Sequence, residues 1–283
     1  MKLLRCVVIL LVLSVLARPA LAQSRPLVTE DPETVPAGNL LVEAGIDHAR
    51  DAVYPVSGLT GNLWRVGTFG LSIGISPIAE LQIDGGLVNR LAIVDSDPLA
   101  PLASMVDITG ESTRDIEDVS IGAKVRFVSE TASRPAVAIR FWTKLPNAGN
   151  ESGLGLDTTD FHFGVAIGKT VQSVRIVGNA GFGILADPVR GDRQNDVLDY
   201  GLSVARAVRQ GVELVGELNG RQNTRSGTPP VGTDSLSTMR VGARLTRGPV
   251  RLDGALAIGI TDRDPSWGFT AGLTYVFRAF TVQ

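Results

Sequence analysis

The chain has few of the side chains on which most enzymes and metal sites depend. Of its 283 residues only one is a cysteine and only two are histidines. The cysteine, Cys6, lies in an amino-terminal segment with the features of a cleaved export signal, so the mature chain is expected to carry no thiol. Disulfides, thiolate nucleophiles and cysteine-based metal sites are excluded on that basis.

The chain also lacks a long apolar run after its first 22 residues. Lys2 and Arg5 precede an apolar run over residues 6–17, and Ala20-Leu21-Ala22 then provides a small-x-small cleavage site. This order predicts a signal peptide over residues 1–22. No later stretch approaches the ~20 apolar residues that a transmembrane helix requires. Any membrane insertion of the mature chain must therefore use strands.

Strong net charge is absent as well. The formal charge is −2, and it becomes −5 when Lys2, Arg5 and Arg18 leave with the signal peptide. A weakly acidic chain offers no extended basic surface to a phosphate backbone. We therefore expect no nucleic-acid partner.

Short alternating stretches make up most of the remaining sequence. From residue 39 onward, apolar side chains recur at every second position, which is the period of a β-strand. In the last stretch one face holds Trp267, Phe269, Ala271, Leu273, Tyr275 and Phe277, and the other holds Gly268, Thr270, Gly272 and Thr274. The pattern predicts about twelve strands, each with one apolar face and one small or polar face.

The connections between these strands alternate between long and short. Long polar loops are predicted over residues 49–61, 94–115, 147–159, 186–195, 222–235 and 261–266, and tight turns over residues 76–78, 129–135, 170–173, 208–211 and 247–249. Outer-membrane barrels have short periplasmic turns and long outer loops. We therefore predict an all-β fold: a transmembrane antiparallel up-and-down β-barrel of about 12 strands over residues 39–283.

The same alternation would suit a soluble β-sandwich, in which the apolar faces form a core instead of meeting lipid. Strands of about ten residues, their even number and aromatic residues near strand ends favour the barrel. The aromatic residues predicted near the outer rim are Phe141, Phe161, Phe163, Tyr200 and Trp267, and those near the periplasmic rim are Phe127, Tyr275 and Phe277.

The polar face of each barrel strand would line the lumen. The alternation assigns to it Glu43, Glu80, Asp84, Arg90, Lys124, Arg126, Arg140, Lys144, His162, Arg175, Glu213, Glu217, Arg240 and Arg244, and also Asp47, Asp199, Arg251 and Asp253. Acids fall mainly on the first, third and ninth strands, and bases on the fourth to seventh. We expect an acidic wall that faces a basic wall. The lumen is then either a polar passage or a salt-bridged plug.

Catalysis is not expected. A barrel hydrolase needs a nucleophile beside a base that a third group orients. The candidate bases are His48, at the start of a predicted loop, and His162, predicted to point inward. Both suit ordinary polar positions better, and we expect neither catalytic residues nor a metal or other cofactor.

Residues 23–38 precede the first strand and contain Pro26, Pro32 and Pro36. Composition alone predicts a disordered lead-in that hangs in the periplasm. Alternatively, the segment folds into the lumen as a gate.

Three stretches carry a family resemblance: residues 25–40 (RPLVTEDPETVPAGNL), residues 116–127 (IEDVSIGAKVRF), and Leu145-Pro146 leading through residues 153–157 (GLGLD) into a strand. They resemble a family of bacterial outer-membrane transporters named for the meta-pathway of phenol degradation. The resemblance implies a barrel that moves small hydrophobic or aromatic compounds, supplies no catalytic residues, and favours the gate. Such barrels commonly end on an aromatic residue that the assembly machinery reads, whereas this chain ends on Gln283.

The expected function is passive uptake of small, aromatic or hydrophobic solutes through the cell outer membrane, by a monomer or an oligomer. The expected partners are outer-membrane lipid and lipopolysaccharide, the barrel-assembly machinery and the transported solute. Two alternatives stay open: a closed barrel with a structural or adhesive role, and an outer-membrane hydrolase.

Overall fold

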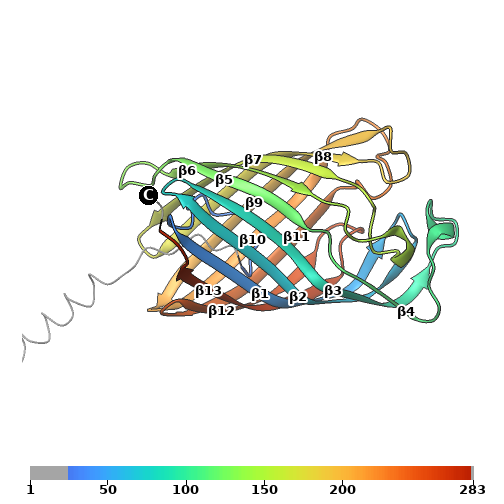
Figure 1. The fold of residues 1–283 in the computed structure, drawn as a ribbon, viewed down its shortest axis with the longest axis horizontal. Coiled ribbons are helices and arrows are strands. Elements are labelled where there is room, and N and C mark those ends of the chain that lie inside the picture. The colour runs from blue at the N-terminus through green and yellow to red at the C-terminus, as the bar shows by residue number, and fades with distance from the viewer. Residues whose placement is uncertain (1–24, 282–283) are drawn as a thin grey trace, which may run out of the picture.

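Twelve strands, each bonded to two neighbours, close into an antiparallel barrel (Figure 1). The computed structural model describes residues 25–281, so the predicted signal peptide lies outside the described residues. The strands are β1 (Asn39–Tyr54), β2 (Leu59–Ser76), β3 (Ala79–Ser96), β5 (Ser120–Val128), β6 (Ala136–Lys144), β7 (Asp160–Val171), β8 (Val174–Ala186), β9 (Gln194–Arg209), β10 (Val212–Asn223), β11 (Leu236–Arg247), β12 (Val250–Gly259) and β13 (Trp267–Arg278). The predicted all-β barrel is confirmed.

The barrel closes where β1 pairs with β13, from Asn39 opposite Arg278 to Arg50 opposite Trp267. A further short strand, β4 (Ser112–Asp115), pairs only with β3. Two 3-10 turns, Ala103–Met105 and Asn150–Ser152, lie in the connections. Among the described residues, no helix combines the length and the apolar character needed to cross a membrane.

The alternation of short and long connections is present. Residues 77–78, 129–135, 172–173, 210–211 and 248–249 link strands at the end where the carboxyl terminus lies, and residues 97–119, 145–159, 187–193, 224–235 and 260–266 link them at the other end (Figure 1).

The predicted long loop over residues 49–61 is wrong, because β1 and β2 continue through most of it and only residues 55–58 connect them. A register shift between Ala49 and Ala52 accommodates polar residues within the strand. Gly58, with φ of 79°, then closes a tight turn in which its N–H donates to the Tyr54 carbonyl at 2.8 Å.

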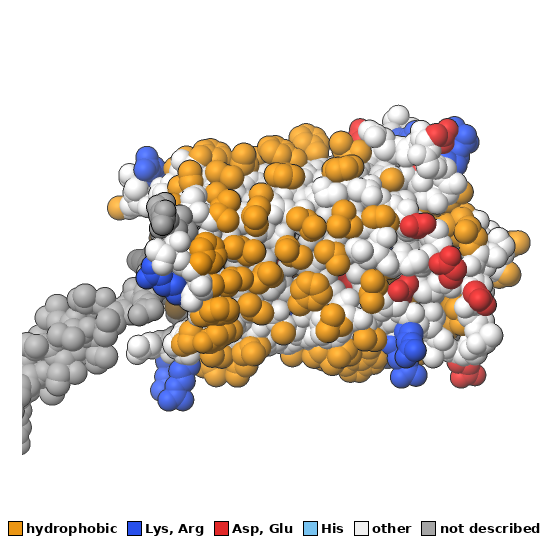
Figure 2. Space-filling model, in the orientation of Figure 1, with side chains coloured by type: hydrophobic (Ala, Val, Ile, Leu, Met, Phe, Trp, Pro, Cys, Tyr) orange, Lys and Arg blue, Asp and Glu red, His pale blue; other side chains and the backbone are white. Residues whose placement is uncertain are grey.

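On the face of the barrel shown in Figure 2, apolar side chains form a band and charged side chains gather at the two ends. Leu256 is 63% exposed and Phe182 62% exposed, although both lie in the middle of strands. Exposed apolar residues of this kind would be costly in water but are suited to lipid. The sandwich alternative, in which these faces would be buried, is wrong. Of the predicted rim residues, Tyr200 is only partly exposed, and the other seven are exposed: Phe141, Phe161, Phe163, Trp267, Phe127, Tyr275 and Phe277.

One charged residue lies on the opposite face from its prediction. A bulge at Gly67, whose φ is 71°, shifts the register between β1 and β2. Beside it on β3, Leu87 and Val88 are both exposed, so the alternation slips by one residue. Asn89 and Leu91 are buried and Arg90 is exposed on the outside. Because a slip of one residue exchanges the two faces of a strand, the lumenal assignment of Arg90 is wrong.

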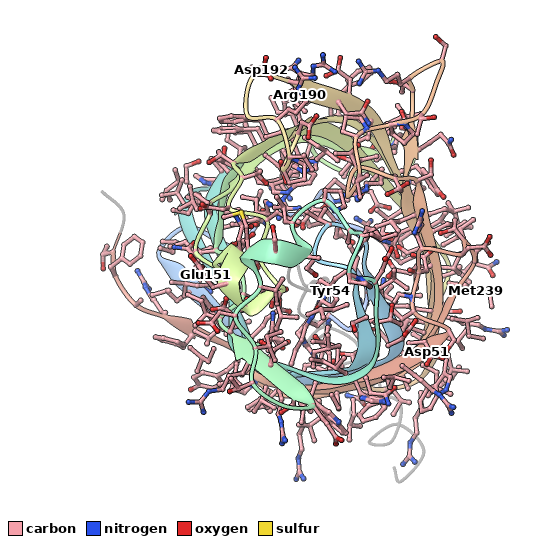
Figure 3. The ribbon with its side chains drawn as sticks, turned by 90° about the vertical axis from the view of Figure 1, so that its right-hand side faces the viewer. Asp51, Tyr54, Glu151, Arg190, Asp192 and Met239 are labelled. Atoms are coloured by element: carbon pink, nitrogen blue, oxygen red, sulfur yellow. The ribbon has the colours of Figure 1, made fainter. Side chains whose placement is uncertain are left out.

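The outer mouth of the barrel is partly filled by its own loops. Leu63 and Leu91 belong to a buried apolar cluster on the inner wall, and Val106, Ile108 and Leu154 from the long loops pack against it. Viewed from this end, the side chain of the labelled Tyr54 lies within the ring of strands (Figure 3). The loops therefore narrow the outer entrance by packing apolar side chains against the inner wall.

We expect Leu256→Arg to lower the free energy of unfolding by about 2–4 kcal/mol, because it places a charge on the lipid-facing side near mid-depth. Urea unfolding in lipid vesicles measures the change. Leu256→Met is the matched control and should differ little from wild type. If the two variants are equally stable, this face does not contact hydrocarbon.

Candidate functional site

Residues 25–38 do not hang outside the barrel but run along its inner wall. The segment forms hydrogen bonds or ion pairs with side chains of β2, β3, β5, β6, β8, β10, β11, β12 and β13. It therefore crosses the lumen as an inserted segment, a name used below for residues 25–38.

The acidic residues of the inserted segment meet the basic residues of the wall. Glu30 lies 2.6 Å from the Nζ of Lys124 and 3.7 Å from Arg140. Lys124 is only 1% exposed and also pairs with Glu80 at 3.0 Å. A buried ammonium group needs such partners, because an uncompensated charge in a low-dielectric site is strongly unfavourable.

The same match continues towards the periplasmic end. Asp31 accepts two hydrogen bonds from Arg175, at 3.0 and 2.7 Å, in a bidentate pair. Glu33 forms an ion pair with Arg126. Bidentate arginine–carboxylate contacts fix orientation as well as distance. Each consecutive acid of the segment therefore has its own base on the wall.

The one base of the inserted segment lies against the acidic side. Arg25 is 3.5 Å from the Asp253 carboxylate and donates to the Thr270 hydroxyl at 2.8 Å. Its guanidinium occupies the space above Gly45 and Gly272, where an added Cβ would lie 2.4 Å from it. Glycine at these positions makes room for the arginine.

Between these ends the backbone of the segment is held by the wall. The Glu217 carboxylate accepts hydrogen bonds from the N–H groups of Val28 and Thr29, each at 2.8 Å. The Asn179 amide accepts from the Glu30 N–H at 2.7 Å and donates to the Glu30 carbonyl at 2.9 Å. Side chains thus replace the strand partner that this extended stretch lacks.

Electrostatics keep the central acid ionised. Burial alone would raise the pKa of Glu30, but the charges of Lys124 and Arg140 hold that pKa at about 2. Because the pKa is lowered, the attraction is fully present above the ordinary carboxyl range and is lost only as the pH falls towards 2. The inserted segment keeps this contact at neutral and mildly acidic pH.

The structure places seventeen of the eighteen residues assigned to the lumen on the inner side: Glu43, Asp47, Glu80, Asp84, Lys124, Arg126, Arg140, Lys144, His162, Arg175, Asp199, Glu213, Glu217, Arg240, Arg244, Arg251 and Asp253. Arg90 alone of the eighteen lies outside. The walls are less segregated than expected, since Glu80 pairs with Lys124 on the adjacent strand and Glu217 lies 2.9 Å from Arg240.

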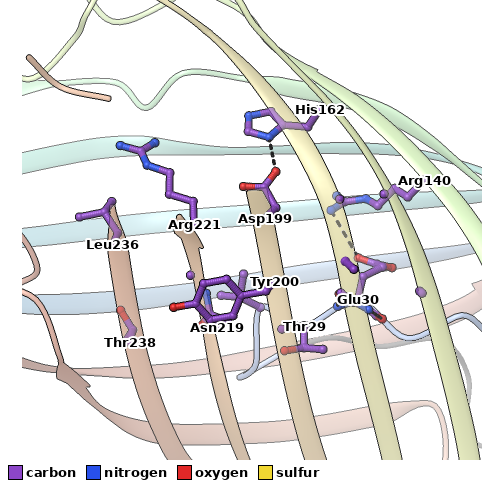
Figure 4. Close-up of a pocket in the computed structure, with 18 of the residues that line it drawn as sticks. Thr29, Glu30, Arg140, His162, Asp199, Tyr200, Asn219, Arg221, Leu236 and Thr238 are labelled. Carbon is purple, nitrogen blue, oxygen red and sulfur yellow. Dashed lines mark hydrogen bonds and ion pairs between the residues drawn. The ribbon is translucent and has the colours of Figure 1, made fainter. Parts of the chain in front are cut away.

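Above the inserted segment, on its side towards the outer loops, lies a cavity of about 330 Å³ (Figure 4). Val28, Thr29 and Glu30 line it on one side, and glycines and small residues of β7 to β9 form much of its wall. Arg221 also lines it and donates to the carbonyls of Gly232 and Asp234 at 2.9 Å. A second cavity, of about 320 Å³, lies beside Arg25.

Trp142 lines the cavity above the inserted segment and is its main residue that was not predicted from the sequence. It stacks on the His162 ring at 4.5 Å between centroids, and the Arg140 guanidinium lies 4.5 Å from the Trp142 ring. Its position between Arg140 and Lys144 on one strand was the available signal, because alternate residues share a face. The acids of the inserted segment were missed because no strand pattern covers them.

The two histidines differ in their surroundings. His162 Nδ1 lies 2.7 Å from the Asp199 carboxylate (Figure 4), the kind of contact that orients a histidine base, and within residues 25–281 no hydrogen bond joins a serine or threonine hydroxyl to the His162 ring. His48 was predicted at the start of a loop, and this prediction is wrong because His48 lies within β1. Residues 70–74 (GLSIG) have the spacing of a hydrolase nucleophile elbow. Ser72, however, lies inside β2, paired with both neighbouring strands, whereas an elbow is a strand-to-helix turn.

The sequence matches the family model described as "Putative MetA-pathway of phenol degradation" over residues 23–279. The chain belongs to this family. The match spans the inserted segment and all twelve barrel strands of this family member. No curated protein matches the chain significantly.

Among solved structures, the barrel is similar to the COG4313 outer membrane channel from Pseudomonas putida F1. The TM-score is 0.62 at 15% identity, and the match covers 87% of this chain and 98% of the other. The NanC porin (TM-score 0.49, 8% identity, 83% and 98% covered) and the translocator domain of the autotransporter NalP from Neisseria meningitidis (0.48, 11%, 84% and 88%) are more distant. The first similarity supports the outer-membrane barrel fold.

A disulfide should lock the inserted segment to the wall. A Cβ built on Gly201 would lie 3.4 Å from the Cβ of Thr29, close to the usual separation of about 3.8 Å in disulfides. We expect Thr29→Cys/Gly201→Cys to oxidise readily in the folded barrel, as measured by protection from a thiol-reactive label that is added after the protein is unfolded, because position 29 is buried in the folded state.

The matched control is Thr29→Cys/Gly178→Cys. Gly178 is on the adjacent strand, and a Cβ there has no heavy atom within 4 Å. This pair should stay reduced and labelled. Equal labelling of both pairs would show that residues 25–38 do not occupy the lumen as described.

Proposed function

We propose that the protein is an outer-membrane channel for passive entry of small solutes, and that the inserted segment obstructs its lumen reversibly. One observation carries the proposal: the segment that crosses the lumen precedes β1 and is fixed mainly by side chains of the wall, and it is not part of the strand ladder. Such a segment can leave without breaking the barrel, because the twelve strands are paired without it.

The charge pattern supports a reversible obstruction. The segment is held mainly by ion pairs and hydrogen bonds, including Glu30 with Lys124 and Asp31 with Arg175. When it leaves, water entering the lumen can solvate the exposed charges on both partners, which reduces the cost of separating them. An apolar plug would gain no such solvation, because its departure would expose apolar surface to water.

We expect deletion of residues 23–38 to increase single-channel conductance in a planar bilayer. The oxidised Thr29→Cys/Gly201→Cys variant should conduct less than wild type, and reduction with a thiol should restore wild-type behaviour. The disulfide keeps the segment in place, so the difference between its two redox states isolates movement of the segment from any change in the wall.

The control is the Thr29→Cys/Gly178→Cys variant, whose conductance should not respond to the thiol. Equal conductance of the oxidised and reduced locked variant would contradict the gate. Absence of conductance in all forms, including the deletion, would contradict the channel and favour a closed structural barrel.

We further propose that the solutes are small molecules with an aromatic or other apolar body. The cavity next to the inserted segment has the size of a small organic molecule and combines Trp142, Leu236 and Val28 with the polar groups Asp199 and Arg221. Apolar walls with a few polar groups favour amphipathic solutes over fully hydrated ones.

We expect Trp142→Ala to lower the ratio of phenol flux to flux of a small sugar by about two- to tenfold, which corresponds to the loss of one aromatic contact. Liposome swelling measures both fluxes, and their ratio removes the effect of a wider lumen. Phe141→Ala is the control, because Phe141 is the adjacent residue and faces outward. A ratio unchanged by Trp142→Ala would remove this cavity from solute selection.

A further inference from the structure

A row of directly opposed residues crosses the outer surface near the end that carries the long loops. From β13 to β4 the pairing runs Phe269 with His48, His48 with Trp64, Trp64 with Arg90, and Arg90 with Arg114. These five residues, with Trp267, are called the outer row below. Directly opposed residues on one face of a sheet are near enough to interact.

Four aromatic rings form the first half of the outer row. The centroid of His48 lies 4.6 Å from that of Trp64, 5.6 Å from Phe269 and 5.7 Å from Trp267. Trp64 and Trp267 are about 40% exposed on the outside. Aromatic residues with polar groups are typical of the boundary between hydrocarbon and headgroups. The outer row therefore lies at the headgroup level of the outer leaflet.

Two arginines form the second half. Arg90 and Arg114 are both exposed and are opposite one another on adjacent strands. Like charges in directly opposed positions are destabilising unless an anion lies between them. Arg50, at the same level, has Asp51 at 3.6 Å. No carboxylate of residues 25–281 lies within 4.0 Å of either Arg90 or Arg114.

The nearest acid along the chain is already engaged. Asp115, next to Arg114, accepts hydrogen bonds from the backbone N–H groups of Ile116 and Gly149, at 2.7 and 3.0 Å. The short strand β4, which is not one of the twelve barrel strands, places Arg114 opposite Arg90 of β3. Without β4, Arg90 would have no arginine beside it. The pair is thus formed by an addition to the barrel.

We propose that the outer row binds a phosphorylated glycolipid of the outer leaflet, with its phosphate between Arg90 and Arg114 and its sugar or acyl portion on the aromatic rings. Two guanidinium groups offer the planar donors that suit phosphate, and the rings offer flat apolar surface to a sugar or an acyl chain. The site requires only that the barrel lies in an outer membrane and is independent of solute passage.

The test compares the purified wild-type barrel with Arg90→Gln/Arg114→Gln. Native mass spectrometry from detergent micelles measures the affinity for three probes: bis-phosphorylated lipid A, lipid A without phosphates, and phosphatidylglycerol. We expect wild type to bind the phosphorylated glycolipid best, and the double variant to bind it at least about fivefold more weakly, because each arginine near a membrane surface contributes an appreciable attraction to anionic lipid.

The matched control is Arg190→Gln/Arg225→Gln, which removes two exposed arginines from other outer loops and should bind like wild type. Equal affinity of wild type and Arg90→Gln/Arg114→Gln would overturn the proposal. So would equal binding of lipid A without phosphates, which would indicate an apolar surface only, or equal binding of phosphatidylglycerol, which would indicate general attraction to anions.

A single variant covers the case in which the double variant does not fold. Arg114→Gln changes only β4, which lies outside the closed ring of strands. In detergent without lipid it should melt at or above the wild-type temperature, because it removes a like-charge contact. With phosphorylated lipid A it should gain less stability than wild type. The same gain for both proteins would contradict the site.

Discussion

Pairing of β1 with β13 is the contact on which the rest of the structure depends. In lipid, an unpaired strand edge leaves N–H and C=O groups without partners, so a sheet can span the membrane only if it closes. Closure by twelve continuous pairs from Asn39 to Arg50 gives the barrel an inside and an outside. Each strand then has one face towards lipid and the other towards the lumen. Across the hydrocarbon band the outer face is apolar and polar residues face the lumen, whereas the outward-facing Arg90 and Arg114 lie near the end that carries the long loops.

A lumen crowded with charge then requires internal compensation. The wall of β5, β6 and β8 has Lys124, Arg140 and Arg175 close together, whereas Asp253 and Glu43 lie on β12 and β1. The inserted segment has the complementary order, with Arg25 at one end and its acids at the other. Its path across the lumen follows from this match of charges. The two cavities that border it are space that the segment and the loops leave unfilled.

Local alternation predicted the strands and the inward residues, because the side-chain period of a strand depends on nothing beyond its neighbours. It failed at Arg90, where the bulge at Gly67 shifts the faces by one residue. A glycine within a strand is not enough to predict a bulge from the sequence. It also failed at residues 49–61, where Arg50 and Asp51 resembled a loop although both strands continue. The inserted segment has no periodicity, so composition suggested disorder. Its charges were informative only when set against those of the wall.

The contacts of the inserted segment are coupled, and this shapes how it can move. Lys124 is shared by Glu30 and Glu80, and Glu30 is shared by Lys124 and Arg140. Removing one partner from such a cluster leaves another buried charge uncompensated, which costs several kcal/mol, about 3–5 for a single broken pair. Partial withdrawal is therefore less favourable than either full docking or full release into water. If the segment gates the channel as proposed, it would have two well-separated states, and the channel would open in discrete steps instead of widening gradually.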